Sequence, residues 1–133
     1  MPRSLLEVVV VGAGVAGLGV AWRLAESGVR VLVVDRGAAG RGATWAAAGM
    51  LAPSAELGFE ELDLYALARE SLARWPAFAA DLESATGLDV GLRTEGTLVA
   101  AEDRDSLVAL RRLFAFQQAQ GAPVDWLTGE AAR

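Results

Sequence analysis

The chain has 133 residues, a formal net charge of −5 at pH 7 and a hydrophobic fraction of 53%. It contains neither cysteine nor histidine, which excludes disulfides, thiolate metal sites and a histidine general base from this stretch. The negative charge argues against a nucleic-acid partner, because proteins that bind nucleic acid neutralise phosphates with excess lysine and arginine. The length suffices for one modest core, as expected of an α/β domain.

The first predicted element is a strand of four valines, residues 8–11, which leads into Gly-Ala-Gly-Val-Ala-Gly at residues 12–17. A helix is expected after this motif, and then a second strand over residues 29–34 that ends at Asp35. Strand, G-x-G-x-x-G, helix, strand and acidic residue together are typical of a dinucleotide-binding unit. The alternative is a glycine-rich turn that binds no ligand.

The three glycines of the motif have separate expected roles. Gly12 permits the tight turn off the strand, Gly14 lets the backbone approach a pyrophosphate, and Gly17 lets the helix pack closely on the sheet. The phosphates are then expected at the helix N-terminus, where free N–H groups and the helix dipole favour negative charge.

Asp35 stands close to the position where an acidic residue hydrogen-bonds a ribose hydroxyl, about 20 residues beyond the motif. Its carboxylate suits an unphosphorylated ribose and would repel a 2′-phosphate, although Arg36 offsets part of that repulsion. FAD or NAD is therefore favoured over NADP. The alternative is a solvated turn residue at the end of the strand.

A glycine-rich loop follows over residues 36–44, and then a run of small apolar residues from Trp45 to Pro53. Small side chains let the backbone lie close to a flat ligand. Thr44 supplies a hydroxyl that is placed to cap the helical turn after it. The alternative is a flexible loop with a short buried helix.

The apolar stretch over residues 8–22 is not expected to be a signal peptide or a membrane span. It has 15 residues, fewer than the roughly 18 to 20 needed to cross a bilayer, and Glu7 precedes it where a signal requires positive charge. We therefore expect a cytoplasmic protein without a membrane partner.

The rest of the chain is expected to hold helices and short strands. An amphipathic helix over residues 60–75 is predicted to break or kink at Pro76 and to continue to Thr86. Asp103 is expected to cap another helix that reaches about Gln120. Short strands are predicted at residues 89–92, 97–101 and 124–127, and Thr128 is predicted to cap a further helix.

The order G-x-G-x-x-G, acidic residue, then Gly-Ala-Thr-x-Ala-Ala-Ala-Gly-Met at residues 42–50 resembles the D-amino-acid-oxidase-like family of FAD-dependent amine oxidases. Within that family, the run at residues 46–51, with Pro53 and Glu56, is most similar to the glycine oxidases of thiamine biosynthesis. Residues 96–99, 111–113 and 124–127 also fit the family pattern, so the resemblance covers essentially the whole chain.

The resemblance implies FAD as the cofactor and a set of residues that bind it. Asp35 is one methylene shorter than the glutamate usual in the family, and Trp45 is bulkier than its counterpart in many relatives. The implied residues are Gly12, Gly14, Val15, Ala16 and Gly17 at the pyrophosphate, Asp35 and Arg36 at the adenosine ribose, Ala43 and Thr44 along the phosphates, and Ala48, Gly49 and Met50 at the flavin ring, with Met50 also near the substrate.

The implied function is that of the N-terminal, FAD-binding portion of a flavin-dependent amine or amino-acid oxidase. Its partners would be a small amine or amino acid and dioxygen, and a homo-oligomer remains open. No catalytic residue and no metal ligand are assigned, because relatives grip the substrate carboxylate with an arginine from the C-terminal half of the chain. Two alternatives remain: the nucleotide-binding unit of an NAD-dependent dehydrogenase, and a truncated dinucleotide-binding fragment without turnover.

The expected fold class is α/β. It comprises a Rossmann-like FAD-binding βαβ unit, a helical segment and the start of a mixed α+β substrate domain. Residues 1–86 are assigned to the FAD-binding domain and residues 87–133 to the start of the substrate domain. Only two strong strand candidates precede Met50, whereas a doubly wound sheet needs several. The fold is therefore expected to be incomplete, as part of a longer enzyme; a mini-domain with a rearranged sheet is the alternative.

Overall fold

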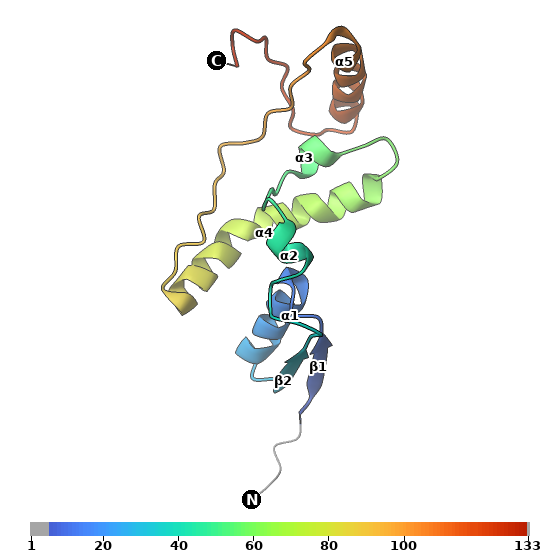
Figure 1. Cartoon of the computed structure of the whole chain (residues 1–133). Helices are drawn as coiled ribbons and strands as arrows, with labels where there is room; N and C mark the ends of the chain where they lie inside the picture. The colour runs from blue at the N-terminus through green and yellow to red at the C-terminus, as the bar shows by residue number, and fades with distance from the viewer. Residues whose placement is uncertain (1–5, 133) are drawn as a thin grey trace, which may run out of the picture. The chain divides into compact units, whose positions relative to one another are not determined.

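A computed structural model describes residues 6–132, and the chain divides into two compact units, Met1–Met50 and Leu51–Arg133 (Figure 1). We call them the first unit and the second unit and describe each by itself. The domain boundary predicted between residues 86 and 87 stays a prediction. The outer ends of the predicted domains, residues 1–5 and 133, lie outside the described residues.

The first unit contains a parallel pair of strands, β1 (Val8–Val11) and β2 (Val31–Val34). Val8 lies opposite Val31, and the register continues in step to Val11 opposite Val34. β-branched side chains favour the extended backbone, and a parallel pair needs a crossover connection between its strands. The predicted βαβ unit is confirmed, with β2 beginning two residues later than expected.

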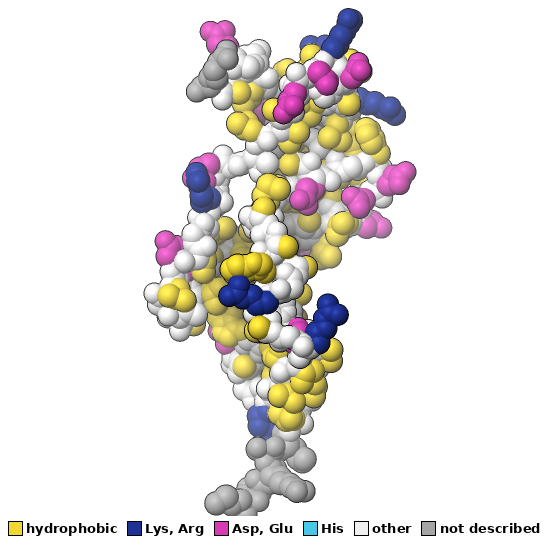
Figure 2. Space-filling model, in the orientation of Figure 1, with side chains coloured by type: hydrophobic (Ala, Val, Ile, Leu, Met, Phe, Trp, Pro, Cys, Tyr) yellow, Lys and Arg dark blue, Asp and Glu magenta, His cyan; other side chains and the backbone are white. Residues whose placement is uncertain are grey.

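Helix α1 (Val15–Glu26) is the crossover connection and packs against both strands. Valines at alternate positions of the strands are partly buried, as the period of two in a strand requires. The intervening apolar side chains are exposed, and Figure 2 shows hydrophobic side chains gathered over the strands. These exposed residues are Val9, Val11, Leu32 and Val34. The unit ends with one helical turn, α2 (Ala43–Ala46).

The second unit is built from helices: α3 (Pro53–Glu56), α4 (Leu62–Thr86) and α5 (Arg104–Ala119). Its small core joins the start of α4 to the end of α5. Leu57, Tyr65 and Ala122 are buried there, and Phe116 and Val124 pack against them. Inside this core the side-chain amide of Gln117, near the end of α5, donates hydrogen bonds to the backbone carbonyls of Ser54 and Leu57.

Helix α4 passes through Pro76 as one continuous element, so of the expected break or kink at Pro76 the break does not occur. Proline removes one backbone N–H and thus leaves the carbonyl of Leu72 without its helical donor, but the helical bonds on either side remain. The helix ends as predicted at Gly87, whose φ of 69° is left-handed. No helix among residues 6–132 is long and apolar enough to span a bilayer.

Helix α5 begins as expected at Asp103. The Oδ1 of Asp103 accepts a hydrogen bond of 2.7 Å from the backbone N–H of Ser106, and the Oγ of Ser106 accepts one of 3.0 Å from the backbone N–H of Asp103. This reciprocal pair is a capping box, which satisfies backbone donors that the first helical turn leaves free.

The three further strands predicted at residues 89–92, 97–101 and 124–127 are not formed. Within residues 6–132, only β1 and β2 are paired as strands. A strand requires a ladder partner, and a strand-like sequence pattern cannot provide one. The helix predicted after Thr128 is reduced to a turn, in which the Oγ1 of Thr128 accepts a hydrogen bond of 3.2 Å from the N–H of Ala131.

Candidate cofactor site

The turn between β1 and α1 has a geometry that only glycine allows. Gly12 has a φ of 108°, a conformation that side chains rarely adopt. A Cβ atom on Gly17 would lie 1.9 Å from the carbonyl oxygen of Gly12 and 3.3 Å from a methyl group of Val10. The expected roles of these two glycines are therefore visible in the packing: one reverses the chain, and the other brings α1 against the turn and β1.

The N-terminus of α1 is capped from a distant part of the chain. Gly14 is the N-cap residue and has no side chain to offer, but the Oγ1 of Thr44 accepts a hydrogen bond of 2.9 Å from the N–H of Val15. A Cβ on Gly14 would lie 3.1 Å from the same hydroxyl oxygen. Thr44 was expected to cap the turn that follows it; instead it lies inside α2 and caps α1.

Asp35 holds the glycine turn from the end of β2. Its Oδ2 accepts a hydrogen bond of 2.8 Å from the N–H of Ala13, and its Oδ1 accepts one of 2.9 Å from the N–H of Gly37. These two hydrogen bonds lower the pKa of the Asp35 carboxyl below its ordinary value, and the bond from Ala13 contributes more than the bond from Gly37. Sequence reasoning missed the contact with Ala13. The register offers a signal for it, because continuing the parallel pairing beyond Val11 and Val34 brings Gly12 beside Asp35.

These groups surround one cavity of about 220 Å³. The N–H of Gly40 donates a hydrogen bond of 2.7 Å to the carbonyl of Ala13, which joins the loop after β2 to the glycine turn. Two arginines and one aspartate line the cavity, which leaves its lining with a formal charge of +1. The lining residues are Ala13, Gly14, Asp35, Arg36, Ala38, Gly40, Arg41, Gly42, Ala43 and Thr44.

The cavity brings together five of the residues predicted from the sequence and leaves out the others. Gly14, Asp35, Arg36, Ala43 and Thr44 line it. Gly12 and Gly17 shape the turn behind it, and the N–H of Val15 is already bonded to Thr44. The predicted residues that do not line it also include Ala16, Ala48, Gly49 and Met50, and the side chain of Met50 is exposed.

Sequence reasoning gave no role to Arg41, which also lines the cavity. Its guanidinium carbon lies 3.9 Å from the centroid of the Trp45 ring, a cation–π contact between the loop and α2. The spacing of four residues between an arginine and a tryptophan is the only hint of this pair in the sequence.

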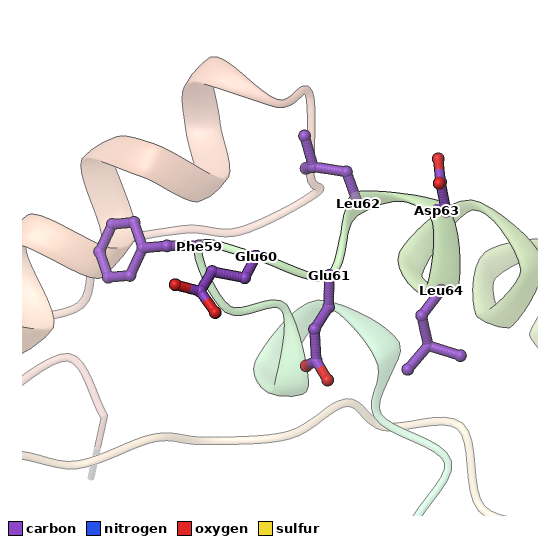
Figure 3. A pocket seen from close by; sticks show the side chains of 6 residues that line it. All are labelled: Phe59, Glu60, Glu61, Leu62, Asp63 and Leu64. Atoms are coloured by element: carbon purple, nitrogen blue, oxygen red, sulfur yellow. The ribbon is translucent and has the colours of Figure 1, made fainter.

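A second hollow, at the start of α4, is not arranged as a binding site. It measures about 500 Å³ and is lined by six consecutive residues, Phe59 to Leu64, at the start of α4. The carboxylates of Glu60, Glu61 and Asp63 point in different directions and do not converge on a ligand (Figure 3). Nor do residues 6–132 contain a cluster of acidic side chains arranged to hold a metal ion.

The cavity beside Asp35 fits the phosphate and ribose part of a dinucleotide. Its lining residues include three glycines, a threonine, an aspartate and two arginines, which are residue types that suit phosphate and ribose groups. Its volume is below the roughly 300 Å³ at the lower end of small-molecule sites, so it is too small to hold a whole dinucleotide.

Comparison with known proteins identifies the family of the chain. The family model described as FAD dependent oxidoreductase matches residues 7–133. The chain is 39% identical over 126 residues to glycine oxidase of Geobacillus kaustophilus, an alignment that covers 94% of this chain and 33% of that protein. It is 32% identical over 107 residues to one of the subunits of opine oxidase from Rhizobium meliloti, covering 80% of this chain and 28% of the relative.

Solved structures give the same result. The crystal structure of glycine oxidase from Geobacillus kaustophilus superposes with a TM-score of 0.86 at 38% identity, over 94% of this chain and 34% of that one. The crystal structure of glycine oxidase from Bacillus cereus superposes with a TM-score of 0.85 at 35% identity, over 97% of this chain and 34% of that one. The chain thus spans about one third of the length of these relatives. Over that third, it belongs to the family of FAD dependent oxidoreductases.

Proposed function

We propose that this chain provides the FAD-binding part of a flavin-dependent oxidase that acts on glycine or a similarly small amino acid. The observation that carries the proposal is the single cavity formed by the glycine turn, Thr44 and Asp35, in a chain 39% identical to a glycine oxidase. The substrate class comes from that relative's name. Because the chain spans about one third of that relative, the activity is proposed for the full-length protein.

The residues of the first unit have distinct parts in this proposal. The turn at Gly12, Gly14 and Gly17 lets phosphate oxygens approach backbone N–H groups, and Val15 and Ala16 continue that turn into α1. Asp35 and Arg36 meet the adenosine ribose. When bound, FAD supplies the acceptor for the hydride equivalent that leaves the amine-bearing carbon of the substrate.

The other proposed cofactor residues follow the loop. Ala43 and Thr44 lie along the phosphates, and the Thr44 hydroxyl that accepts the Val15 N–H has a proton to donate to a phosphate oxygen. Ala48, Gly49 and Met50 lie against the flavin ring because their small or unbranched side chains let a flat ring approach, and Met50 also faces the substrate. Met50 is exposed, as such a contact requires.

The proposed overall reaction converts glycine, dioxygen and water to glyoxylate, ammonia and hydrogen peroxide. In this reaction the protein orients the substrate amine toward the cofactor and limits access of water. We also propose that this reaction serves the biosynthesis of the thiazole ring of thiamine. A homo-oligomeric assembly is also proposed.

The test uses the full-length polypeptide that the gene encodes. We expect it to purify with bound flavin, to release FAD on denaturation, and to form peroxide and glyoxylate from glycine in equal amounts. Sarcosine, D-alanine and an opine serve as competing substrates under the same conditions. A protein that binds NAD in place of FAD, or that holds FAD but oxidises only opines, would overturn the proposal.

A further inference from the structure

Arg41 and Trp45 form a pair at the cofactor cavity that no assigned role explains. The Arg41 guanidinium lies over the Trp45 ring at 3.9 Å from its centroid, and Arg41 also lines the cavity. Trp45 is 69% exposed. A large exposed ring on a one-turn helix contributes little to a core, so a different use for this side chain has to be considered.

The loop that carries Arg41 is fixed at both ends. The N–H of Gly40 bonds the carbonyl of Ala13 at 2.7 Å, and the N–H of Arg41 bonds the carbonyl of Ala38 at 3.2 Å. On the other side, α2 begins at Ala43 and carries Trp45. Arg41 is thus held between the glycine turn and a ring that restricts its guanidinium, which lowers the conformational entropy that the side chain loses when it binds an anion.

The charges around the cavity select the kind of ligand that Arg41 would bind. Asp35 already accepts hydrogen bonds from two backbone N–H groups, and its carboxylate forms no ion pair with Arg41 among the contacts of the described residues. The guanidinium therefore keeps its planar set of donors for a ligand. Guanidinium groups bind phosphate through two parallel hydrogen bonds.

We propose that Arg41, oriented by Trp45, binds the pyrophosphate of the dinucleotide cofactor, with Arg41 as a binding residue and Trp45 as a positioning residue. This rests on the proposed function, because it requires FAD to occupy the cavity beside Asp35. The Arg41 guanidinium thus brings a positive charge to the pyrophosphate, which otherwise meets backbone N–H groups and the Thr44 hydroxyl.

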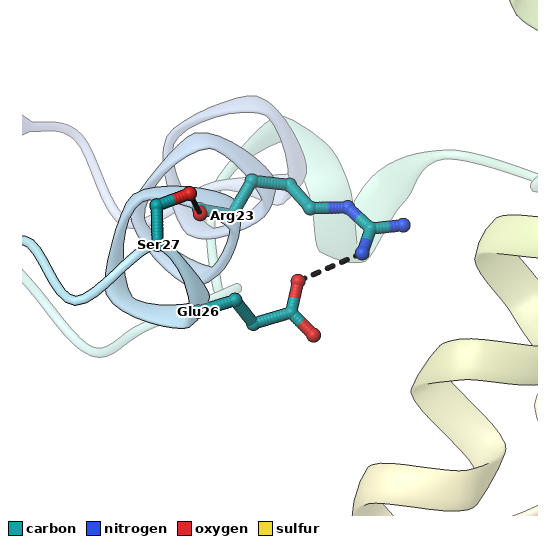
Figure 4. A network of polar contacts seen from close by, with 3 residues as sticks. All are labelled: Arg23, Glu26 and Ser27. Carbon is teal, nitrogen blue, oxygen red and sulfur yellow. Dashed lines mark hydrogen bonds and ion pairs between the residues drawn. The ribbon is translucent and has the colours of Figure 1, made fainter.

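A control pair occurs elsewhere in the first unit. The guanidinium of Arg23 lies 4.5 Å from the centroid of the Trp22 ring, but Arg23 belongs to the last turn of α1 and does not line the cavity. It forms an ion pair of 2.7 Å with Glu26, and its carbonyl accepts a hydrogen bond from Ser27 (Figure 4). Arg23→Gln therefore removes an arginine from the same kind of ring contact without altering the proposed site.

The experiment measures the affinity of the full-length apoprotein for FAD and for ADP, with adenosine as a probe that lacks phosphate. Arg41→Gln is expected to weaken FAD and ADP binding by about tenfold or more, the effect of losing a charged hydrogen-bond partner, and to leave adenosine binding unchanged. Arg23→Gln is expected to match the wild type for all three. Equal loss of adenosine affinity, or no loss for FAD, would overturn the inference.

Trp45→Leu tests the positioning role. It is expected to weaken FAD binding when Arg41 is present and to add little in the Arg41→Gln background, since the ring acts through the guanidinium. Additive losses would show that the two side chains act independently.

Two further outcomes separate folding and function from the inference. If Arg41→Gln melts at a lower temperature than Arg23→Gln, Arg41→Lys replaces it: lysine keeps the charge but not the planar fork, so intermediate FAD affinity is expected, and wild-type affinity would contradict the proposal. If the wild type itself fails to bind FAD, the proposed function fails first. If the wild type binds FAD and all variants bind equally, only the inference fails.

Discussion

The two units of the chain use similar local patterns with different results. In the first unit, the predicted strands at β1 and β2 pair with each other, and the loops after each of them converge on one cavity. In the second unit, α4 and α5 form, but the three segments with strand-like patterns pair with nothing among the described residues. A helix satisfies its backbone within its own segment, whereas a strand depends on a second one.

The units also differ in what fixes their polar groups. In the first unit, Asp35 and Thr44 accept hydrogen bonds from the backbone at the start of α1. In the second unit, the buried amide of Gln117 bonds the carbonyls of Ser54 and Leu57. The first arrangement shapes a surface that receives a ligand, and the second closes a core. Substitutions at the cavity and its glycine turn should therefore affect cofactor binding, whereas those in the core of the second unit should affect stability alone.

The largest effect is expected at Gly17. In Gly17→Ala the new methyl group meets the Gly12 carbonyl, a backbone atom that cannot move without opening the turn. We expect a loss of about 1–3 kcal/mol or more in unfolding free energy, together with loss of FAD binding. Urea unfolding and flavin content measure the two effects.

Gly19→Ala is the control for this substitution. Gly19 lies in the same helix, and a Cβ there would meet nothing within 4 Å. Alanine is the better helix former, so stability should rise by up to about 1 kcal/mol with FAD binding retained. Equal behaviour of the two variants would refute the close approach at Gly17.

The next largest effect is expected at Gln117 in the second unit. Gln117→Leu removes both amide bonds and leaves the carbonyls of Ser54 and Leu57 without that donor. The expected cost is about 1–3 kcal/mol of unfolding free energy, with unchanged FAD affinity. Gln118→Leu, at an exposed neighbouring position, should have little effect. Loss of FAD binding in Gln117→Leu would remove the distinction between the units.

A smaller effect is expected at Thr44. Thr44→Val keeps the shape of the side chain but removes the acceptor for the N–H of Val15. We expect a loss of about 1 kcal/mol of stability, the usual contribution of an N-cap bond, and weaker FAD binding. Thr44→Ser keeps the hydroxyl and should retain most of both properties. If serine and valine were equally damaging, the methyl group and not the hydroxyl would be the important part.

The smallest effect should be present at neutral pH and should disappear in acid. The pKa of Asp35 is lowered in the folded protein, so its hydrogen bonds stabilise the fold above the unfolded pKa of about 3.9, and this contribution is lost as the pH falls through the folded pKa. Asp35→Asn should therefore be less stable than the wild type at pH 7, with the difference shrinking below about pH 4. Urea unfolding between pH 2 and 7 measures it. A difference that stays constant across this range would mean that the charge of Asp35 has no part in holding the turn.

Local patterns in the sequence determined much of this protein. The valine strands, the glycine turn and α1 follow from signals within a few residues of each other, as does the start of α5 at Asp103. The G-x-G-x-x-G motif with Asp35 also predicted the residues of the cavity walls at Gly14 and Asp35, because the spacing of that motif is set by a strand, a turn and a helix.

Tertiary structure decided what depends on contacts between distant residues. Thr44 caps a helix 29 residues before it, Asp35 bonds an N–H 22 residues before it, and Gln117 reaches carbonyls 60 and 63 residues away. A sequence pattern shows which polar groups need a hydrogen-bond partner, but it does not show which partner comes within hydrogen-bond distance. The same reason explains the unpaired strand patterns of the second unit: extended backbone becomes a strand only where the fold brings a second one beside it.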